Sequence, residues 1–311
     1  MKTKSGIAVH GGAGTILRSS MTTEKENLYR AGLQEALTAG WSLLREGKSS
    51  VDAVQTAVTI LENNPLFNAG KGSVFNHNGK HSMDASIMEG ETLNAGAVAY
   101  VSGVKNPVIL ARKIMDDPEF VFLSGKGAED FAREMNLRFE DEKYFYDEYR
   151  FRQYKEALKE NSVQLDHSPS IKEKKFGTVG AVALDSEGNL AAATSTGGMT
   201  NTKFGRIGDT PMIGAGTYAN NKTCAVSCTG NGEFFIRAVA AYDVSALMEY
   251  KNYTLKEAGE YVVNEKLISI DGEGGLIAID KDGNICMPFN SEGMYRASVS
   301  ENSEIEISIY K

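Results

Sequence analysis

The chain has 311 residues, of which 41% are hydrophobic and 24% are charged, an ordinary composition for a globular protein with a sizeable core. Its formal net charge of −8 disfavours polyanionic partners, so neither nucleic acid nor an anionic membrane is expected to bind. No run approaches the ~18 apolar residues of a membrane-spanning helix, and three cysteines cannot all pair, which predicts reduced thiols and a cytoplasmic protein.

The first half of the chain predicts a buried strand, then amphipathic helices, then further strands. Ile7 to Val9 is an apolar run that leads into the turn His10-Gly11-Gly12, where His10 is expected to be a buried structural residue. The glycines end that run too early for a signal-peptide core. Ser49-Ser50 are typical N-caps for the second helix. The spacing predicts helices over 24–47 and 51–62, strands over 82–88 and 95–102, and short helices after Pro107 and Gly127.

The second half contains two similar hairpins and two helical runs. Residues 180–190 resemble residues 275–285, and in each an Asp begins a turn in which Gly takes the left-handed position. Either an ancient duplication or common turn chemistry would explain this likeness. The flanking runs are almost wholly apolar, so we expect strands covered on both faces, as in stacked sheets sandwiched by helices. Helices are predicted over 234–250 and 254–266.

Between the two halves the regular pattern breaks down. Residues 140–175 mix acids, bases and aromatic residues, and they end in the charged run 172–175. We expect a mobile linker over 140–176 that contains one helix over 149–160. Such a linker would let two parts of the chain separate after a cut before residue 178, although an ordinary surface loop has the same composition.

The pair Gly177-Thr178, directly after this segment, is the most informative feature of the sequence. A threonine hydroxyl needs a base beside it, and one such base is the residue's own α-amine, which exists only if the chain is cut just before it. That amine has a pKa of about 7.7–8.0 and accepts a proton near neutral pH. Glycine at 177 lets the backbone bend so that the hydroxyl reaches the preceding carbonyl. Alone the dipeptide is ambiguous, because Gly-Thr also begins many ordinary strands.

Other motifs accompany this pair on both sides. They are His10-Gly11-Gly12-Ala13-Gly14, the run from Leu61 to Phe75, Met83-Asp84-Ala85-Ser86, Thr194-Ser195-Thr196-Gly197-Gly198, Gly205-Arg206-Ile207-Gly208-Asp209 and Thr229-Gly230-Asn231-Gly232-Glu233. Together they resemble the plant-type L-asparaginase and isoaspartyl peptidase (β-aspartyl-peptidase) family of N-terminal-nucleophile hydrolases. The resemblance covers most of the chain apart from residues 140–175, and separated motifs in one order are more specific than any single glycine-rich loop.

The resemblance implies a fold, a maturation step and an activity. The family fold is a four-layer αββα sandwich of the α/β (α+β) class, here one domain over residues 1–311. A self-cleaving precursor would yield an α subunit, 1–177, and a β subunit, 178–311. The mature enzyme would release L-aspartate from β-aspartyl dipeptides, and ammonia plus L-aspartate from L-asparagine. No catalytic cofactor is expected, the substrate is a small amino acid or dipeptide, and the assembly would be a homo-oligomer of αβ units, (αβ)2.

The resemblance also implies which residues carry out the chemistry. Thr178 would be the nucleophile after cleavage at Gly177, and Thr196 would hold its amine and hydroxyl by hydrogen bonds. Thr229 and the Gly230 amide would donate to the developing oxyanion, which is typically worth about 2.7–4 kcal/mol per donor. Thr196 as an ordinary strand end and Thr229-Gly230 as a turn are the alternatives.

Four further residues would bind the substrate. Arg206 would hold its α-carboxylate through a planar two-point fork, and Asp209 would hold its α-ammonium. Gly232 would line the same pocket, and Asn68 would lie at the pocket mouth and help orient the nucleophile. An exposed ion pair between Arg206 and Asp209, worth about 0–1 kcal/mol, is the alternative.

The run 61–71 resembles a loop that holds a monovalent cation in this family, so a structural Na⁺ or K⁺ is expected. Its ligands would be the backbone carbonyls of Leu61, Glu62, Asn64, Phe67, Ala69 and Lys71. The Lys71 carbonyl can bind only if its cationic side chain points away. The histidines show no metal-ligand spacing.

Three rival functions stay open at this level. Glycosylasparaginases, which cleave N4-(β-N-acetylglucosaminyl)-L-asparagine, tend to carry Asp-Thr at the cut and a secretory or lysosomal address. A threonine-dependent endopeptidase is a second rival. A non-catalytic small-molecule binding protein is a third, and denaturing electrophoresis distinguishes it because it never yields two bands. The family often places His two residues before the nucleophile, whereas this chain has Phe176, a departure that bears on the rate of cleavage.

Overall fold

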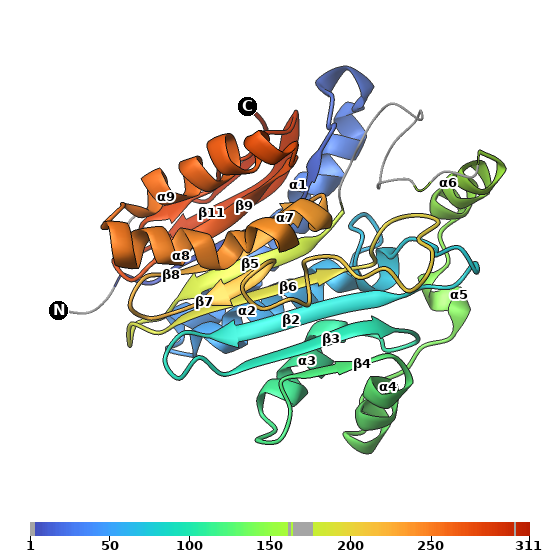
Figure 1. Cartoon of the computed structure of the whole chain (residues 1–311), viewed down its shortest axis with the longest axis horizontal. Helices are drawn as coiled ribbons and strands as arrows, with labels where there is room; N and C mark the ends of the chain where they lie inside the picture. Colours follow the sequence, from blue (N-terminus) through green and yellow to red (C-terminus); the bar gives the residue numbers. More distant parts are fainter. Residues whose placement is uncertain (1–3, 161–162, 164–176, 302) are drawn as a thin grey trace.

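Two sheets face each other at the centre of the protein (Figure 1). The computed structural model describes residues 4–160, 163, 177–301 and 303–311. Over these residues the larger sheet contains, in spatial order, β12 (Glu306–Tyr310), β11 (Gly293–Ser300), β1 (Gly6–Gly14), β5 (Val179–Leu184), β6 (Leu190–Thr196), β2 (Met83–Glu89), β3 (Ala95–Val101) and β4 (Phe122–Ser124). The smaller sheet contains β10 (Ile285–Cys286), β9 (Gly274–Asp280), β8 (Cys224–Gly230) and β7 (Thr217–Ala219).

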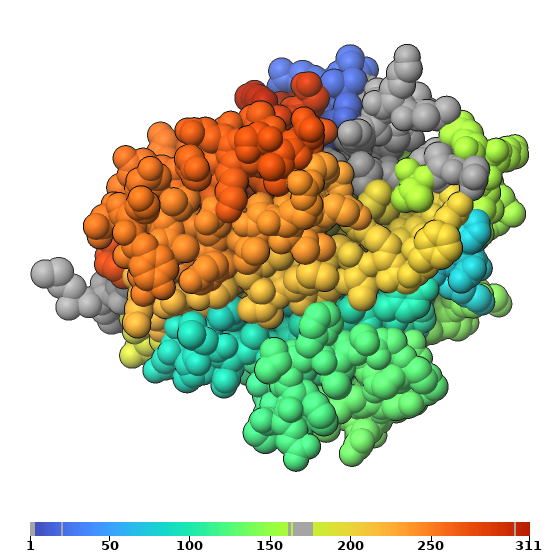
Figure 2. All heavy atoms as spheres, in the orientation of Figure 1, coloured from blue at the N-terminus to red at the C-terminus, as the bar shows by residue number. Residues whose placement is uncertain are grey.

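Helices cover the outer face of each sheet. The larger sheet is covered by α1 (Thr23–Arg45), α2 (Ser50–Asn63) and α3 (Pro107–Met115). The smaller sheet is covered by α8 (Ala240–Lys251) and α9 (Leu255–Tyr261), which form the orange surface in Figure 2. Three apolar clusters fill the three interfaces, one between the sheets and one beneath each helical layer. These four layers confirm the predicted αββα sandwich.

Local sequence signals explain most of the element boundaries. The Ser49 side chain accepts a hydrogen bond from Asp52 N, as predicted for an N-cap, and Thr22 caps α1 in the same way through Lys25 N. Both hairpin glycines, Gly188 and Gly283, have positive φ as the turn pattern predicted. One of the two hairpins lies in each sheet. The helix expected after Gly127 begins earlier, as α4 (Gly125–Glu134).

The prediction of one helix over 234–250 is wrong. The structure has two helices, α7 (Gly232–Ala238) and α8, because Val239 between them adopts a left-handed conformation with φ 51°. The first amides of α8 bond to a loop instead of continuing α7: Ala241 N donates to Ala215 O and Tyr242 N to Gly214 O. The helix predicted over 254–266 also changes character, since α9 ends at Tyr261 and a π-helical turn, Val262–Lys266, follows.

The first part of the predicted linker is largely helical. The helix predicted over 149–160 is confirmed as α6 (Glu148–Lys159), and α5 (Glu142–Phe145), which was not predicted, precedes it; Figure 1 shows both beyond one end of the larger sheet. Aromatic residues of this segment pack against the rest of the protein, since Tyr154 stacks on Phe75 and Phe145 lies beside His81. Apart from Val163, the remainder of the predicted linker, 161–176, lies outside the described residues.

Three short segments complete the described elements: the 3₁₀ helices η1 (Arg18–Ser20), η2 (Gly70–Gly72) and η4 (Ile268–Ile270). In the described part of the chain, no helix is both long and apolar enough to cross a membrane.

Candidate active site

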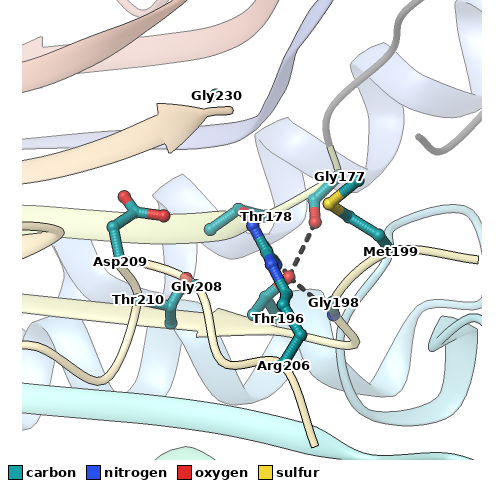
Figure 3. A pocket seen from close by; sticks show the side chains of 10 residues that line it. All are labelled: Gly177, Thr178, Thr196, Gly198, Met199, Arg206, Gly208, Asp209, Thr210 and Gly230. Atoms are coloured by element: carbon teal, nitrogen blue, oxygen red, sulfur yellow. Dashed lines mark hydrogen bonds between the residues drawn. The ribbon is translucent and has the colours of Figure 1, made fainter. Parts of the chain in front are cut away.

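A small cavity lies where β5 begins and β6 ends, beneath the loop 197–216 (Figure 3). Its volume is about 20 Å³, room for about one water molecule but not for an amino acid. It is lined by Gly177, Thr178, Thr196, Gly198, Met199, Arg206, Gly208, Asp209, Thr210 and Gly230. Residues from four separate motifs of the sequence therefore meet here.

The nucleophile candidate lies in a directed chain of hydrogen bonds. Thr178 Oγ1 donates to Thr196 Oγ1 at 3.3 Å, and Thr196 Oγ1 donates to the carbonyl oxygen of Gly177 at 2.8 Å (Figure 3). Gly198 N donates to Thr196 Oγ1 at 3.1 Å and fixes that hydroxyl from the other side. Strand register brings the two threonines together, because Val179 on β5 pairs with Ser195 on β6. A proton can thus pass from the Thr178 hydroxyl toward Thr196.

Asn68 is buried and contacts Gly177, the residue before the nucleophile candidate, so the prediction that it lies at the pocket mouth is wrong. Its amide nitrogen donates to Gly177 O at 3.0 Å and to Gly198 O at 2.7 Å, and its oxygen accepts from Val74 N. The side chain is 0% exposed. Gly177 O therefore receives two donors, Asn68 and Thr196, the arrangement that stabilises negative charge on a carbonyl under attack.

The Arg206 side chain carries a partner that the sequence did not predict. Glu233 accepts two hydrogen bonds from it, from Nε at 2.7 Å and from Nη2 at 2.8 Å. The two-point fork is thus already engaged within the protein. Two of the five N–H donors of a guanidinium point to Glu233, and the others can serve a ligand. Glu233 could have been considered as a site residue from the sequence, because it directly follows Gly232 in the last of the matching motifs.

Asp209 meets the requirement for a cation receptor. It is 5% exposed, and its Oδ2 has no hydrogen-bond partner among the described residues. Burial raises the pKa of Asp209 to about 7, although Arg206 acts in the opposite direction. An ion pair between Arg206 and Asp209 is not found in the described part of the chain, because Arg206 pairs with Glu233. A cationic ligand would satisfy the buried oxygen.

Asp84 is a second buried carboxylate that sequence reasoning left without a role. It accepts from Tyr100 N at 2.8 Å, and Gly208 N and Arg206 favour its ionised form. Burial raises the pKa of Asp84 to about 7, and the charge of Asp209 adds to the effect. Asp84 lies on β2 opposite Thr196 in register, so it is a cross-strand neighbour of a residue that lines the cavity.

The predicted oxyanion donors occupy the end of β8. Gly230 lines the cavity, whereas Thr229 is fully buried beside it. Thr229 Oγ1 accepts from Ala13 N at 3.3 Å, which leaves the hydroxyl hydrogen available for a ligand. Gly232 does not line the cavity, but a Cβ there would lie 2.8 Å from Asp209 Oδ1 and 3.0 Å from Arg206 Nη2. A glycine at 232 therefore leaves space for both charged groups.

The loop expected to hold a monovalent cation runs from the end of α2 into η2. Its two glycines allow close backbone packing, because a Cβ at Gly70 would lie 2.5 Å from Glu62 O and one at Gly72 would lie 2.1 Å from Phe67 O. The carbonyls of Leu61, Asn64, Phe67 and Ala69 each accept a backbone hydrogen bond from a residue two or three positions further on. The Lys71 ammonium lies over the Tyr144 ring, 5.4 Å from its centroid, and is thus held by α5. Backbone carbonyls are the oxygen ligands that an alkali cation would use here.

The side chains around that loop are engaged in hydrogen bonds within the protein. The Glu62 carboxylate accepts from Ser195 Oγ at 2.6 Å and Val108 N at 2.9 Å, and it caps α3. Burial raises the pKa of Glu62 to about 7. No group of three His, Cys, Asp or Glu side chains suited to a metal ion occurs among the residues that the structure describes.

The layered fold, with Thr178 directly before the central strand β5, is consistent with the fold of N-terminal-nucleophile hydrolases. A family profile described as "Asparaginase" matches residues 3–309, and the chain belongs to that family.

Relatives with assigned names support the same class. The chain is 52% identical over 296 residues to an isoaspartyl peptidase of Escherichia coli, covering 94% of this chain and 92% of that protein. It is 47% identical to a putative isoaspartyl peptidase/L-asparaginase of Dictyostelium discoideum over the full length of both. An isoaspartyl peptidase/L-asparaginase of Mus musculus is 42% identical over 97% of this chain and 90% of its own. These matches favour an enzyme over a non-catalytic binding protein.

Proposed function

We propose that this protein is a self-cleaving threonine hydrolase that releases L-aspartate from β-aspartyl dipeptides and from L-asparagine. The observation that carries the proposal is the chain of hydrogen bonds from the Thr178 hydroxyl through Thr196 to the Gly177 carbonyl. It joins a nucleophile, a proton acceptor and a polarised carbonyl in one cavity, which is what acyl transfer needs.

Self-cleavage uses the peptide bond before Thr178 as its substrate. Thr178 Oγ1 attacks the Gly177 carbonyl carbon while its hydrogen passes to Thr196 Oγ1 and the hydrogen of Thr196 passes to the Gly177 oxygen, which Asn68 also holds by a hydrogen bond. When the Gly177–Thr178 C–N bond breaks, the C=O bond of the ester forms again, and the hydrogen on that oxygen moves to the nitrogen, which becomes a free amine. Water hydrolyses the resulting ester, which releases the carboxylate of Gly177 and restores the Thr178 hydroxyl. Removal of Gly177 from the cavity wall enlarges the site for a substrate.

Turnover repeats this chemistry on a side-chain amide. The new α-amine of Thr178 takes the proton from its own hydroxyl, and Oγ1 attacks the amide carbon of the substrate. Thr229 and Gly230 N donate to the oxyanion. Ammonia or an amino acid leaves with the proton, and water hydrolyses the aspartyl ester to L-aspartate. Two bands on denaturing electrophoresis, with ammonia from asparagine and leucine from β-Asp-Leu, are the expected results; a stable full-length chain that hydrolyses neither compound would contradict the proposal.

Arg206 and Asp209 recognise the amino-acid end of the substrate. The buried Asp209 oxygen accepts the α-ammonium, and the N–H donors of Arg206 that Glu233 does not use bind the α-carboxylate. One side of the cavity thus complements a zwitterion.

Replacing Arg206 by Lys should raise KM for L-asparagine about tenfold or more, because a single ammonium cannot hold Glu233 by two bonds and also bind the substrate. Steady-state kinetics test this, and kcat should change less than KM. Arg237→Lys is the matched control, since Arg237 lies over the Phe234 ring on α7 and does not line the cavity. An unchanged KM in Arg206→Lys would contradict the assignment.

The KM for L-asparagine should rise as the pH falls through about 7. Asp209 binds an ammonium only when ionised, and because burial raises its pKa to about 7, acid protonates it in this range. The limiting slope is about tenfold per pH unit. Kinetics between about pH 5.5 and 8.5 would measure it. Succinamate, which is asparagine without the α-amino group, is the control: a KM with the same pH dependence would rule out Asp209 as the origin.

The remaining parts of the proposal concern a cation, the assembly and the compartment. The loop 61–71 would hold Na⁺ or K⁺ through backbone carbonyls and so stabilise the segment that carries Asn68. The αβ units would associate as (αβ)2, which exposed aromatic side chains such as Tyr250 and Phe204 favour. Unpaired Cys224, Cys228 and Cys286 suit the reducing cytoplasm.

A further inference from the structure

A buried chain of four hydroxyl groups and one imidazole runs between the two sheets, outside the groups used by the mechanism. Its members, in order, are Ser86 on β2, Thr217 on β7, Thr194 on β6, Ser227 on β8 and His10 on β1, and each is 0% exposed. The successive distances between their polar atoms are 2.7, 2.5, 2.7 and 2.9 Å, all within hydrogen-bond range.

Strand register explains why these five residues meet. Ser86, Thr194, Gly180 and His10 are successive cross-strand partners in the larger sheet. Thr217 and Ser227 are partners in the smaller sheet. The chain therefore crosses from one sheet to the other at every step.

Gly180 makes room for the last link of the chain. A Cβ at this position would lie 2.0 Å from Ser227 Oγ and 2.4 Å from His10 Nε2. Any larger residue would push the hydroxyl and the imidazole apart. The second glycine of the Gly-Thr-Val-Gly run is thus needed for a contact that the sequence alone did not suggest.

Both ends of the chain touch a wall of the active site. At one end, Ser86 Oγ donates to the carbonyl oxygen of Thr210 at 2.6 Å, and Thr210 follows Asp209 and lines the cavity. At the other end, the backbone of Thr178 lies close enough to the His10 ring to favour its protonated form. The chain thus spans the distance between the nucleophile and the proposed receptor for the α-ammonium.

The hydroxyl of Ser86 joins the Thr210 carbonyl to the rest of the chain. Ser86 Oγ donates toward Thr210 O at 2.6 Å and toward Thr217 Oγ1 at 2.7 Å, and Thr217 Oγ1 donates to Thr194 Oγ1 at 2.5 Å. Thr194 Oγ1 also lies 3.4 Å from Gly216 O, which gives its hydrogen a second acceptor. Burial lowers the pKa of His10 to about 3, so the ring that ends the chain is neutral.

We propose that His10, Ser227, Thr194, Thr217 and Ser86 form a positioning relay that fixes the Thr210 carbonyl, and with it Asp209, relative to the nucleophile strand. Ser86 is the anchor, because its hydroxyl contacts both the Thr210 carbonyl and Thr217 on the smaller sheet. The inference rests on the proposed role of Asp209 in binding the substrate.

Thr194→Val tests the relay, because valine keeps the shape of threonine and removes the central hydroxyl. We expect KM for L-asparagine to rise about three- to tenfold with kcat within about twofold, since one buried hydrogen bond is lost on the substrate-binding side. Ser86→Ala should give the same change, and the double variant should be no worse than either single one, because both release the same anchor. If Thr194→Val does not fold, Ser86→Ala carries the test.

Thr223→Val is the matched control. It removes a buried hydroxyl that pairs with Ser245 Oγ at 2.6 Å outside the cavity, so its KM should stay unchanged. Asp209→Ala is measured in parallel. If Asp209→Ala raises KM but Thr194→Val and Ser86→Ala do not, the relay is wrong and the proposed function stands. If Asp209→Ala leaves KM unchanged, both are wrong.

Discussion

Thr178→Ala is expected to abolish both chain cleavage and catalysis. In the proposed mechanism the same hydroxyl attacks the Gly177 carbonyl in maturation and the substrate amide in turnover, and no other hydroxyl donates to Thr196 Oγ1 in the described part of the chain. The expected loss in kcat is on the order of 10⁶-fold, the size found when a hydrolase nucleophile is removed. Electrophoresis reports the cleavage, and an ammonia assay reports the turnover.

Thr178→Ser is the control for this experiment. Serine keeps a hydroxyl on the same strand, so cleavage and some activity should persist. An alanine variant that still splits before residue 178 would show that another group attacks the Gly177 carbonyl. N-terminal sequencing of the smaller chain identifies the bond, and a terminus other than Thr-Val-Gly-Ala in the mature protein would remove the proposed base.

Thr229→Val should lower kcat by about 10²- to 10³-fold and leave KM nearly unchanged. In the proposed mechanism its hydroxyl donates to an oxyanion that forms only in the transition state, so ground-state binding does not depend on it. Chain cleavage should proceed at the normal rate, because the Gly177 carbonyl is held by Asn68 and Thr196 instead. The two reactions of one nucleophile would thereby be separated by a single substitution.

The control for Thr229→Val is again Thr223→Val, which deletes a buried hydroxyl from a residue just before the same strand. Loss of the Thr229 acceptor also leaves Ala13 N without its partner, which costs about 1–3 kcal/mol of stability. Thermal unfolding must therefore accompany the kinetics. A folded variant with kcat within tenfold of the original would place the oxyanion elsewhere, and equally slow cleavage would mean that both reactions use one donor set.

The sequence by itself determined many of the elements and most of the chemistry-bearing residues. Apolar spacing, the Ser49 cap and the hairpin glycines at 188 and 283 are local signals, and local hydrogen bonds enforce them. Thr178, Thr196, Arg206 and Asp209 were predicted from motifs and do line one cavity. The aromatic residues of the segment 140–154 could be read from the sequence, but their packing against Phe75 and His81 could not be predicted from it.

Only the tertiary structure decided which distant groups meet and how far they are buried. Arg206 and Glu233 are 27 residues apart and pair because a loop folds against the start of α7. Asn68 reaches the Gly177 carbonyl across 109 residues, and His10 reaches Ser227 across 217. Spacing within a segment describes its own faces and carries no information on strand order or register. Those pairings set each distance in the site, because a shift of one residue would turn every side chain to the opposite face of its sheet.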